Sequence, residues 1–573
     1  MGERVTVLLL GGLALTFALE WRRPLFTFGQ WGAMTNVELA MVAAVLAWGG
    51  WAVLCRRRPR WPAGIGRAVF LWMIVMALAA LLAPEERLNA VRFTLKVGLG
   101  ALVGWAVYDV ASAPTLGRRE VLSRALALGG LVVAMTGLAE AGRIEPVASW
   151  LGAFKVAPTW VGEFRRVSGT LPYATIAGVV LEMVALLWLA WTLHTSPRRR
   201  PLTALGLAAT LVALVFTLSR GAMVSLALAL LTWGLVAVGR LRTWAPAVAL
   251  AGGALVTVAA TTLLIRPELV WRLRTETDRT WYVAEYRVPG ELWAEPGQQI
   301  EATVTVRNAG VRPWAPEGLA LGYHLRRADG TGVTYDGLRT PLEEPVPPGG
   351  EVTLRAGLWA PPEPGRYVVE WDLVYEGLLW FSWKGSPTAT TRLVVEGAPK
   401  AVEGWSPTPF PTPNHVGVPI PERPELWRAA WLMARERPLL GFGPDSFRLR
   451  YGAYLGYERW NQGIHANNLY LELLATTGWL GLAAFGLVVW RLVALIWTVL
   501  RRTTTPWAHG VALAVGAWLV HGVVDAFLGF TPTLVLFWFT VGLLAAHARA
   551  LPAQDGGGSG GASEVRAGHA ARV

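Results

Sequence analysis

The stretch "GIHANNLYLELLATTGWLGLAAFG" (residues 463–486) places a histidine and two nearby asparagines directly before a long apolar segment. Polar side chains at the edge of hydrocarbon are costly unless they are paired or hydrated. His465, Asn467 and Asn468 are therefore candidate functional residues. The apolar segment that follows them is a candidate membrane span.

The composition of the whole chain is typical of a membrane protein. Of the 573 residues, 53% are hydrophobic and only 16% are charged, whereas a soluble chain of this length would carry much more polar surface. The formal net charge of +13 could indicate a nucleic-acid partner. The basic residues, however, stand in short clusters between apolar runs, as in the cytoplasmic loops of membrane proteins. We expect a lipid bilayer as partner and no nucleic acid.

Apolar runs long enough to cross ~30 Å of hydrocarbon recur along the chain. About 12 such runs are present, at residues 5–19, 36–54, 67–83, 92–110, 121–139, 172–193, 202–218, 221–239, 244–265, 478–500, 507–528 and 531–548. The sequence therefore predicts a polytopic α-helical membrane protein.

Basic clusters indicate how these runs are oriented. With 12 spans both termini share one side, and five clusters fall on that side: "RRRPR" (56–60), "GRR" (117–119), "PRRR" (197–200), "GRLR" (239–242) and "RR" (501–502). By the positive-inside bias this side is the cytoplasm. We expect a multi-pass protein of the bacterial cytoplasmic membrane, with its large loop outside the cytoplasm.

Residues 281–397 follow a different pattern, period-two alternation with Pro and Gly turns, as in "TATTRLVVEG" (388–397). About seven such strands predict an antiparallel β-sandwich outside the cytoplasm. The runs "VRNAGVRPW" and "PPGGEVTLRAGLWAPPEPGRYVVEWDL" resemble the immunoglobulin-like domain of bacterial surface proteins and of an autophagy receptor. The resemblance implies that Trp314, Trp359 and Trp371 are core or inter-sheet residues, with sugar stacking as the alternative.

These features divide the chain into parts. We expect an N-terminal transmembrane bundle (1–265), the all-β immunoglobulin-like sandwich (281–397), a Pro-rich linker (398–424), an outer-face helix and loop that carry the histidine motif (425–467), C-terminal transmembrane helices (468–549) and a disordered tail (550–573).

The predicted orientation brings polar residues from distant parts of the sequence to the outer side. These residues are Arg165, Arg166, Arg220 and His465. Arg220 interrupts two apolar runs with almost no loop around it, against the positive-inside trend. Its alternative role is to anchor the chain at the lipid headgroups.

Further polar residues accompany the motif. His521 and Asp525 are spaced i,i+4 and would share one helix face as a hydrogen-bonded unit; a structural pair inside the bundle is the alternative. Arg448 and Arg450 lie in a basic and aromatic stretch that could instead rest on the outer leaflet.

Four short motifs in this order resemble the O-antigen ligase and polymerase superfamily. They are "RRVSGTLP" (165–172), "LSRGA" (218–222), "RPLLGFGPDSF" (437–447) and "HANNLYLELLATTGWLGLAAF" (465–485). The resemblance covers roughly residues 120–265 and 425–548. It implies a polytopic glycosyltransferase that moves a glycan from a polyprenyl diphosphate carrier to an acceptor hydroxyl on the outer face of the membrane, without a metal or other cofactor. The acceptor would be a glycan, a lipid or a protein.

The resemblance also implies roles for the polar residues. Arginine provides a fixed fork of donors that matches phosphate oxygens, so Arg220, Arg166 and Arg165 are the expected diphosphate contacts. The expected catalytic residues are His465, Asn467 and Asn468, and the supporting ones are His521, Asp525, Arg448 and Arg450.

The histidine motif departs from the pattern of relatives. A histidine followed by Asn, Ser or Gln commonly stands nine residues before GxxG, and here Asn467 and Asn468 occupy those two places before Gly478. His465 lies two residues earlier. Similarly, Tyr173 stands where relatives usually have asparagine after the proline.

Other functions remain compatible with the sequence. The motif spacing favours a ligase, while a repeat-unit polymerase would share the same motifs. A flippase or transporter of lipid-linked glycans would also have many spans with charged residues, and a surface-binding scaffold would use mainly the sandwich.

Overall fold

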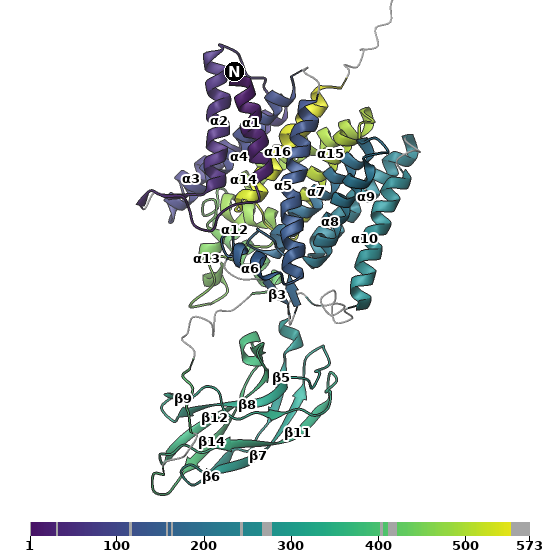
Figure 1. Ribbon diagram of the computed structural model, residues 1–573. Helices are drawn as coiled ribbons and strands as arrows, with labels where there is room; N and C mark the ends of the chain where they lie inside the picture. The colour runs from purple at the N-terminus through teal and green to yellow at the C-terminus, as the bar shows by residue number, and fades with distance from the viewer. Residues whose placement is uncertain are drawn as a thin grey trace, which may run out of the picture.

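The computed structural model describes residues 2–29, 32–113, 117–155, 159–161, 164–240, 245–265, 275, 278–400, 405–410 and 421–551. The helices form one body, and a β domain lies beyond one end of it (Figure 1). The expected tail from residue 552 onward and most of the expected linker lie outside the described residues.

The apolar runs form long helices, because a helix satisfies its own backbone hydrogen bonds where lipid offers no partner. These helices are α1 (Gly2–Thr16), α2 (Asn36–Leu54), α3 (Ile65–Leu81), α4 (Arg87–Ala111), α5 (Arg118–Ala141), α7 (Ala174–His194), α8 (Arg200–Phe216), α9 (Arg220–Arg240), α10 (Ala245–Ile265), α14 (Leu469–Arg502), α15 (Pro506–His521) and α16 (Thr531–Arg549).

Seven helices in the described part of the chain are long and apolar enough to cross a membrane: α2, α4, α5, α7, α9, α14 and α16. The helices α1, α3, α8 and α15 are shorter, with 15 to 17 residues, and ~20 residues are needed for a full crossing. The fold is that of a multi-pass membrane protein with a β region. The number of 12 spans stays a prediction.

Helix α16 is the central helix of the bundle, and 94% of its apolar 18-residue stretch is buried. Glycines let α4 approach it closely. A Cβ atom added at Gly104 would lie 2.7 Å from the carbonyl oxygen of Trp538, and one added at Gly542 would lie 2.3 Å from the carbonyl oxygen of Gly104. Small residues permit this backbone-to-backbone packing between membrane helices.

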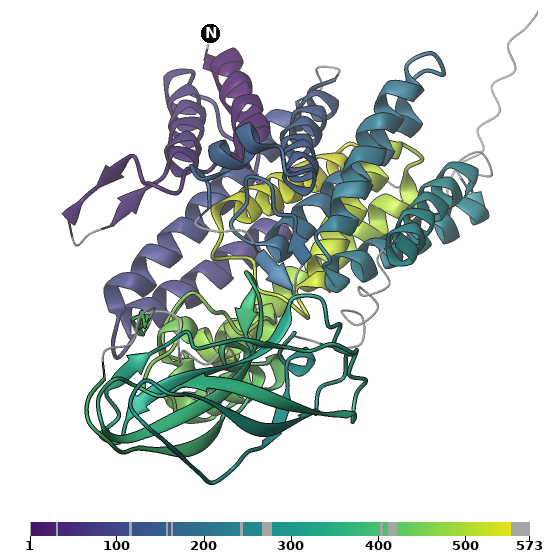
Figure 2. The same cartoon turned by 60° about the horizontal axis from the view of Figure 1, so that its bottom comes forward.

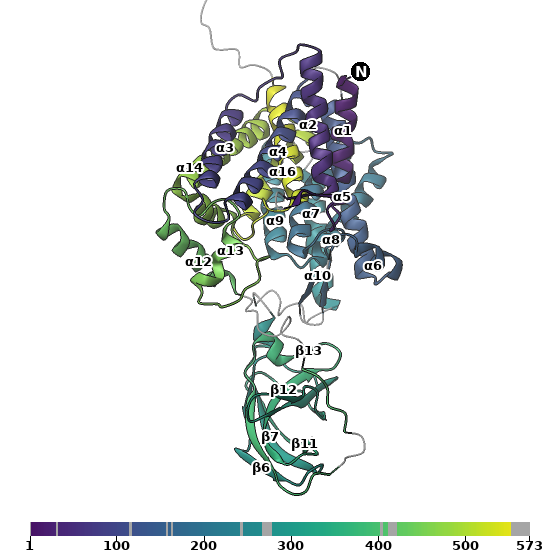
Figure 3. The same cartoon turned by 90° about the vertical axis from the view of Figure 1, so that its left-hand side faces the viewer.

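Short elements gather at the end of the bundle that faces the β domain. They are α6 (Glu145–Leu151), β3 (Thr159–Val161), β4 (Phe164–Arg166), α12 (Arg423–Glu436) and α13 (Phe447–Tyr454) (Figures 1 and 3). The N-terminus lies at the opposite end. A hairpin of β1 (Phe26–Thr27) and β2 (Ala33–Met34) projects from the side of the bundle (Figure 2).

The β domain consists of two sheets. Its elements are β5 (Ala284–Arg287), β6 (Glu291–Ala294), β7 (Gln299–Asn308), β8 (Leu319–Arg327), β9 (Gly332–Thr334), β10 (Thr340–Pro341), β11 (Glu351–Trp359), β12 (Gly365–Tyr375), β13 (Leu379–Trp380) and β14 (Ala389–Val395), with the short helices η2 (Arg279–Trp281) and η3 (Phe381–Lys384).

One sheet has the strand order β10-β8-β12-β14-β6, with β9 on β8 and β13 on β12, and the other has the order β11-β7-β5. The pairs are antiparallel except β14 with β6, which is parallel. Alternate residues of both sheets point into one shared apolar core.

The tryptophans of this domain differ in burial. Trp314 and Trp371 are fully buried in the core, whereas Trp359 is half-buried. The indole of Trp371 donates a hydrogen bond to Thr391 Oγ1 at 2.9 Å, which satisfies its polar atom. Trp314 and Trp371 are therefore core residues, and Trp359 is not fully buried. The immunoglobulin-like assignment stays a prediction.

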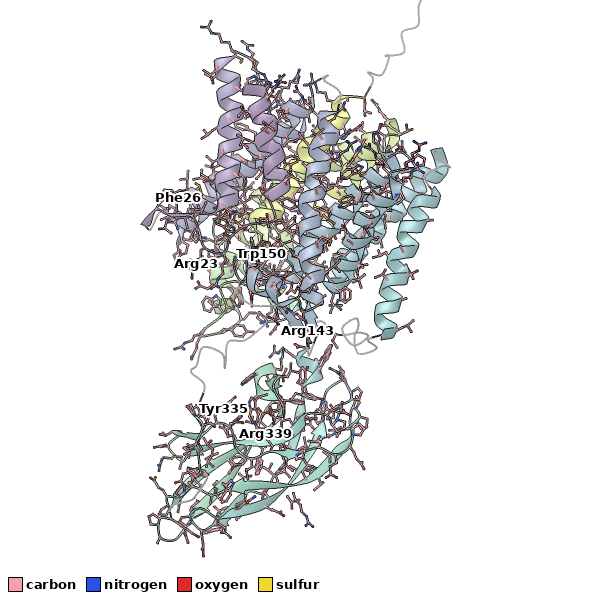
Figure 4. All side chains as sticks on the ribbon, in the orientation of Figure 1. Arg23, Phe26, Arg143, Trp150, Tyr335 and Arg339 are labelled. Atoms are coloured by element: carbon pink, nitrogen blue, oxygen red, sulfur yellow. The ribbon has the colours of Figure 1, made fainter. Side chains whose placement is uncertain are left out.

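The two bodies touch through the β3–β4 hairpin. Val161 of β3 belongs to the same apolar cluster as Trp281 and the rest of the β-domain core. Figure 4 shows Arg143 at the end of the bundle that faces the β domain, and Tyr335 and Arg339 on the β domain itself.

We expect Trp371→Ala to destabilise the β domain by about 3–5 kcal/mol, because truncating a buried tryptophan leaves a cavity. Limited proteolysis and thermal unfolding of the full chain would measure this. Trp293→Ala is the matched control, since Trp293 is 59% exposed on the same sheet. Equal effects of both changes would contradict the assigned core.

Candidate functional site

Helix α14 is broken at Gly478, which has φ 65° and ψ −170° within an otherwise helical run. The backbone at this break pairs with residues 438–443. Trp479 N donates to Pro438 O at 2.7 Å, and Gly443 N donates to Thr476 O at 2.8 Å. The chain segment 438–443 thus satisfies backbone groups that the break would leave unpaired in a buried place.

The close approach of these segments requires glycine. A Cβ atom added at Gly478 would lie 2.3 Å from the carbonyl carbon of Leu439, and one added at Gly441 would lie 2.4 Å from the carbonyl carbon of Thr476. Gly441 also has a positive φ of 62°. The apolar run 478–500 predicted a span that begins at Gly478. The structure instead pairs it with a non-helical segment and extends α14 back to Leu469.

Asn468 begins this outer part of α14 as its N-cap. Its side-chain oxygen accepts hydrogen bonds from Tyr470 N and Leu471 N, both at 3.0 Å, which satisfies donors at the start of the helix. The predicted catalytic residue Asn468 thus has a capping contact in the structure. The preceding Asn467 adopts a left-handed conformation with φ 47°, which asparagine tolerates better than most residues.

His465 forms a pair with Glu472, one turn into α14. His465 Nδ1 lies 2.6 Å from Glu472 Oε1, and the other carboxylate oxygen accepts a hydrogen bond from Ala466 N at 3.0 Å. The two side chains are 14% and 13% exposed. Such a pair fixes the imidazole orientation, so in the neutral form Nδ1–H donates to the carboxylate and Nε2 is the acceptor.

The surroundings of His465 favour its protonated form. Burial alone would lower the pKa of His465, but the Glu472 carboxylate raises it, and the net pKa lies above its ordinary value. Asp445 acts in the same direction and Arg448 opposes it. His465 therefore becomes a neutral base at a higher pH than an unperturbed histidine.

The ring of His465 lines a small cavity of about 20 Å³ together with Glu472, Asp445 and Gly529. Gly529 lies close to the ring, since a Cβ atom added to it would be 3.5 Å from His465 Nε2. Arg448 donates to Asp445 at 2.9 and 2.7 Å. The predicted supporting residue Arg448 is thus next to the histidine but paired with a carboxylate.

A wider cavity of about 620 Å³ shares Gly529 with the small one. Its basic lining residues are Arg22, Lys96 and Lys155. The other lining residues are Glu20, Trp21, Thr35, Phe154, Thr170, Pro172, Tyr173, Phe530, Thr531 and Pro532. Lys96 Nζ donates to the carbonyl oxygen of Gly529 at 3.1 Å. Basic, aromatic and hydroxyl side chains together suit a ligand that carries sugars and negative charge.

Glu140 organises one edge of this cavity. It accepts hydrogen bonds from Lys155 Nζ at 2.6 Å and from Arg165 Nε at 3.2 Å. Its other oxygen accepts from Ser168 N and Gly169 N. Burial lowers the pKa of Lys155, while Glu140 acts against this shift. The predicted diphosphate contact Arg165 is therefore paired with a buried carboxylate.

A second histidine centre lies deeper in the bundle. His521 Nδ1 lies 3.0 Å from Glu182 Oε2, which also accepts a hydrogen bond from the Ser225 hydroxyl. His521 Nε2 is 3.9 Å from Asp525 Oδ2. We expected His521 and Asp525 to lie on one helix face. In the structure α15 ends at His521, so Asp525 lies beyond the helix, and Glu182 of α7 is closer to the His521 ring than Asp525 is.

Two of the predicted arginines belong to this second centre. Arg166 is buried, donates from Nε to the carbonyl oxygen of Thr217 at 2.8 Å, and interacts electrostatically with Asp525. Arg220 begins α9. A Cβ atom on the next residue, Gly221, would lie 2.6 Å from His521 Nε2, so the first turn of α9 packs on that ring.

The two histidine centres are linked through one segment of chain, residues 522–530. Leu469 N donates to Gly522 O at 2.8 Å and to Asp525 O at 3.0 Å. The far end of the segment reaches the His465 cavity at Gly529. Arg450, in contrast, pairs with Glu85 at the surface. Arg166, Arg220, His521 and Asp525 thus lie close together, and residues 522–530 connect them to His465. Arg450 belongs to neither histidine centre.

Sequence reasoning missed the carboxylates. Glu140, Glu182 and Glu472 each lie within or next to an apolar run, and an ionisable residue in such a run is a signal of function or of a buried pair. The sequence does not state their partners, because Glu182 and His521 are 339 residues apart. Within the described ranges, the structure has no group of three or more His, Cys, Asp or Glu that could hold a metal ion.

The fold and the site define a multi-pass membrane protein with two histidine–carboxylate pairs, of which the second lies deeper in the bundle beside Arg166. Residues 420–486 match the family described as O-Antigen ligase. This match covers α12, α13 and the first part of α14, and it supports the O-antigen ligase superfamily, with a glycosyltransferase-like role in polysaccharide biosynthesis at the membrane.

No curated protein matches the chain. Among solved structures, it is similar to the Pseudomonas fluorescens alkylpurine DNA glycosylase AlkC bound to DNA containing an abasic site analog, with 12% identity over 58% of this chain and 97% of that chain. The TM-score of 0.14 is too low to relate the two folds.

We expect Gly478→Ala to destabilise the protein by on the order of 1–3 kcal/mol, because alanine would be strained at this positive φ and would also clash with Leu439. Thermal unfolding in detergent would measure the loss. Gly486→Ala is the control in the same helix, since a Cβ atom there meets nothing within 4 Å. If Gly478→Ala were as stable as the control, the pairing of the break with residues 438–443 would be unimportant.

Proposed function

We propose that the protein is a glycosyltransferase of O-antigen ligase type in the bacterial cytoplasmic membrane. It transfers a glycan from a polyprenyl diphosphate carrier to an acceptor hydroxyl on the outer face of the membrane. The observation that carries the proposal is the His465–Glu472 pair, which lies within the matched residues 420–486 and lines a cavity next to a larger basic one.

His465 is the base in the proposed reaction. In its neutral form Nδ1–H donates to Glu472, and Nε2 takes the proton from the acceptor hydroxyl. The acceptor oxygen then attacks the anomeric carbon of the donor glycan, forming the new glycosidic bond. Glu472 holds the ring in one tautomer and stabilises the imidazolium that results, as a carboxylate does behind other catalytic histidines.

The bond from the anomeric carbon to the carrier breaks in the same step, and the diphosphate leaves with the electron pair. Diphosphate needs cations to hold its developing charge rather than a proton. We assign this role to Arg220 and Arg166, beside the second histidine centre. Arg165 contributes less directly because Glu140 already engages it.

We assign the acceptor to the wider cavity, because Gly529 borders both this cavity and the one at His465. Its lining includes Arg22, Lys96 and Lys155, of which Lys96 also pairs with Glu38 and Lys155 with Glu140, and it suits an acceptor that carries hydroxyl groups and negative charge. Ligation is preferred over repeat-unit polymerisation because the spacing from Asn468 to Gly478 fits the ligase pattern.

The direct test is incubation of the purified protein in lipid bilayers with a polyprenyl diphosphate-linked oligosaccharide and candidate acceptors. Mass spectrometry of the products would identify the transfer. We expect Arg220→Ala to lower the rate by on the order of 10²-fold or more. Arg143→Ala is the control, because Arg143 is an exposed arginine at the same end of the bundle.

Two outcomes would contradict the proposal. One is a correctly inserted Arg220→Ala protein that transfers glycan as fast as the control. The other is a protein that moves the carrier across the bilayer and forms no new glycosidic bond, which would indicate a transporter.

The pH dependence of transfer tests the base. The pKa of His465 is raised, so the reactive neutral form accumulates as pH increases through that pKa, and the rate should rise with pH to a plateau above that pKa. Glu472→Gln removes the charge that raises the pKa. We expect its pH profile to shift to lower pH and its plateau to fall by roughly 10²-fold.

The matched control for this variant is Glu85→Gln, which removes a carboxylate that pairs with Arg450 away from the histidine. An unchanged pH midpoint in Glu472→Gln would exclude His465 as the titrating base, even if the rate fell.

A further inference from the structure

A long apolar groove lies on the side of the bundle between α3, α4 and α16. Its volume is about 590 Å³, and it follows α4 from Thr94 to Tyr108, a length of about 20 Å at the helical rise per residue. Phe70 and Leu95 line it and remain 61% and 67% exposed. Its wall is almost entirely apolar, so in a bilayer a hydrocarbon chain is the natural occupant.

One end of the groove is aromatic and has arginines next to its lining residues. Trp61, Trp105 and Tyr108 line this end. The indole of Trp105 donates to the carbonyl oxygen of Arg60 at 2.7 Å, and Arg549 donates from Nη1 to the Tyr108 hydroxyl at 3.3 Å. The guanidinium of Arg60 donates from Nη1 to the carbonyl oxygen of Asp109 at 3.3 Å. Arg60 and Arg549 are therefore bonded to residues at or next to the aromatic end of the groove, its mouth, and tryptophan and tyrosine favour the level of lipid headgroups.

The charge at this mouth is not balanced. Asp109 is fully buried there and accepts hydrogen bonds from Trp48 Nε1 at 2.8 Å, from Arg57 Nη2 at 2.6 Å and from Arg60 N at 2.9 Å. The Asp109 carboxylate lies 2.5 Å from the guanidinium of Arg57 and 3.8 Å from that of Arg60, while Arg549 binds the neighbouring Tyr108 hydroxyl. The excess of positive charge favours an anion at the mouth.

We propose that this groove binds an anionic phospholipid, with an acyl chain along α4 and the phosphate at Arg60 and Arg549. Basic pockets between membrane helices recognise lipid headgroups in this way. The mouth at Tyr108 is about 18 Å along α4 from Lys96, which borders the wider cavity. The site is therefore separate from the proposed transfer site, and by the predicted orientation it belongs to the cytoplasmic leaflet.

Native mass spectrometry of the full chain tests this site. The protein is reconstituted with equal amounts of phosphatidylglycerol and phosphatidylcholine with the same acyl chains, released, and its retained lipids are counted. We expect phosphatidylglycerol to be retained over phosphatidylcholine by roughly tenfold or more, given about two cationic contacts. Equal retention of both lipids would overturn the proposal.

The double change Arg60→Gln and Arg549→Gln should reduce this ratio to about one. Arg58→Gln is the control, because Arg58 is an exposed arginine in the same basic cluster and should keep the preference. Thermal unfolding of both proteins identifies a misfolded variant. A folded double variant that keeps the preference would overturn the assignment of the two arginines.

The acyl chain is tested by filling the groove. Leu95→Trp should abolish retention of phosphatidylglycerol, whereas Leu81→Trp, on an exposed part of α3 outside the groove, should leave it unchanged. Retention in Leu95→Trp would overturn the proposal. Displacement of the lipid by glycerol 3-phosphate at similar concentration would show a phosphate site without a lipid tail, and would overturn it as well.

Discussion

The break of α14 at Gly478 is the constraint on which the outer part of the membrane body depends. Buried backbone donors and acceptors must be paired, and at this break they are paired by residues 438–443. That pairing ties α12 and α13 to α14. It also separates a short outer helix, capped by Asn468, from the long membrane segment. His465 and Glu472 owe their relative position to this short helix.

Buried carboxylates determine the rest of the site. Glu140, Glu182, Glu472 and Asp109 each hold a basic or imidazole group from another segment. A lone charge in such surroundings is very costly, and breaking a buried pair by removing one partner typically costs about 3–5 kcal/mol. Each pair therefore acts as a specific link between segments, and the pairs of Glu182 with His521 and of Asp109 with Arg57 join elements that are distant in sequence. In the proposed reaction, the same links orient one histidine and gather the arginines.

Much of the architecture could be predicted from local pattern. Apolar runs became helices, period-two alternation became strands, and the predicted site residues Arg166, Arg220, His521 and Asp525 lie together. Two contacts were not predicted. Asn468 caps the outer helix, while its catalytic role stays a prediction, and Gly478 pairs with a loop segment. Both depend on backbone hydrogen bonds between segments, which side-chain patterns do not encode.

The sequence by itself determined the membrane character, the inserted β region and the motif that supports the O-antigen ligase superfamily, because hydropathy and strand alternation are properties of neighbouring residues. Only the tertiary structure decided which group each charged residue meets. Arg165 meets Glu140, Arg450 meets Glu85 and His465 meets Glu472. The physical reason is that charge pairing depends on distance in space, and helix packing sets that distance.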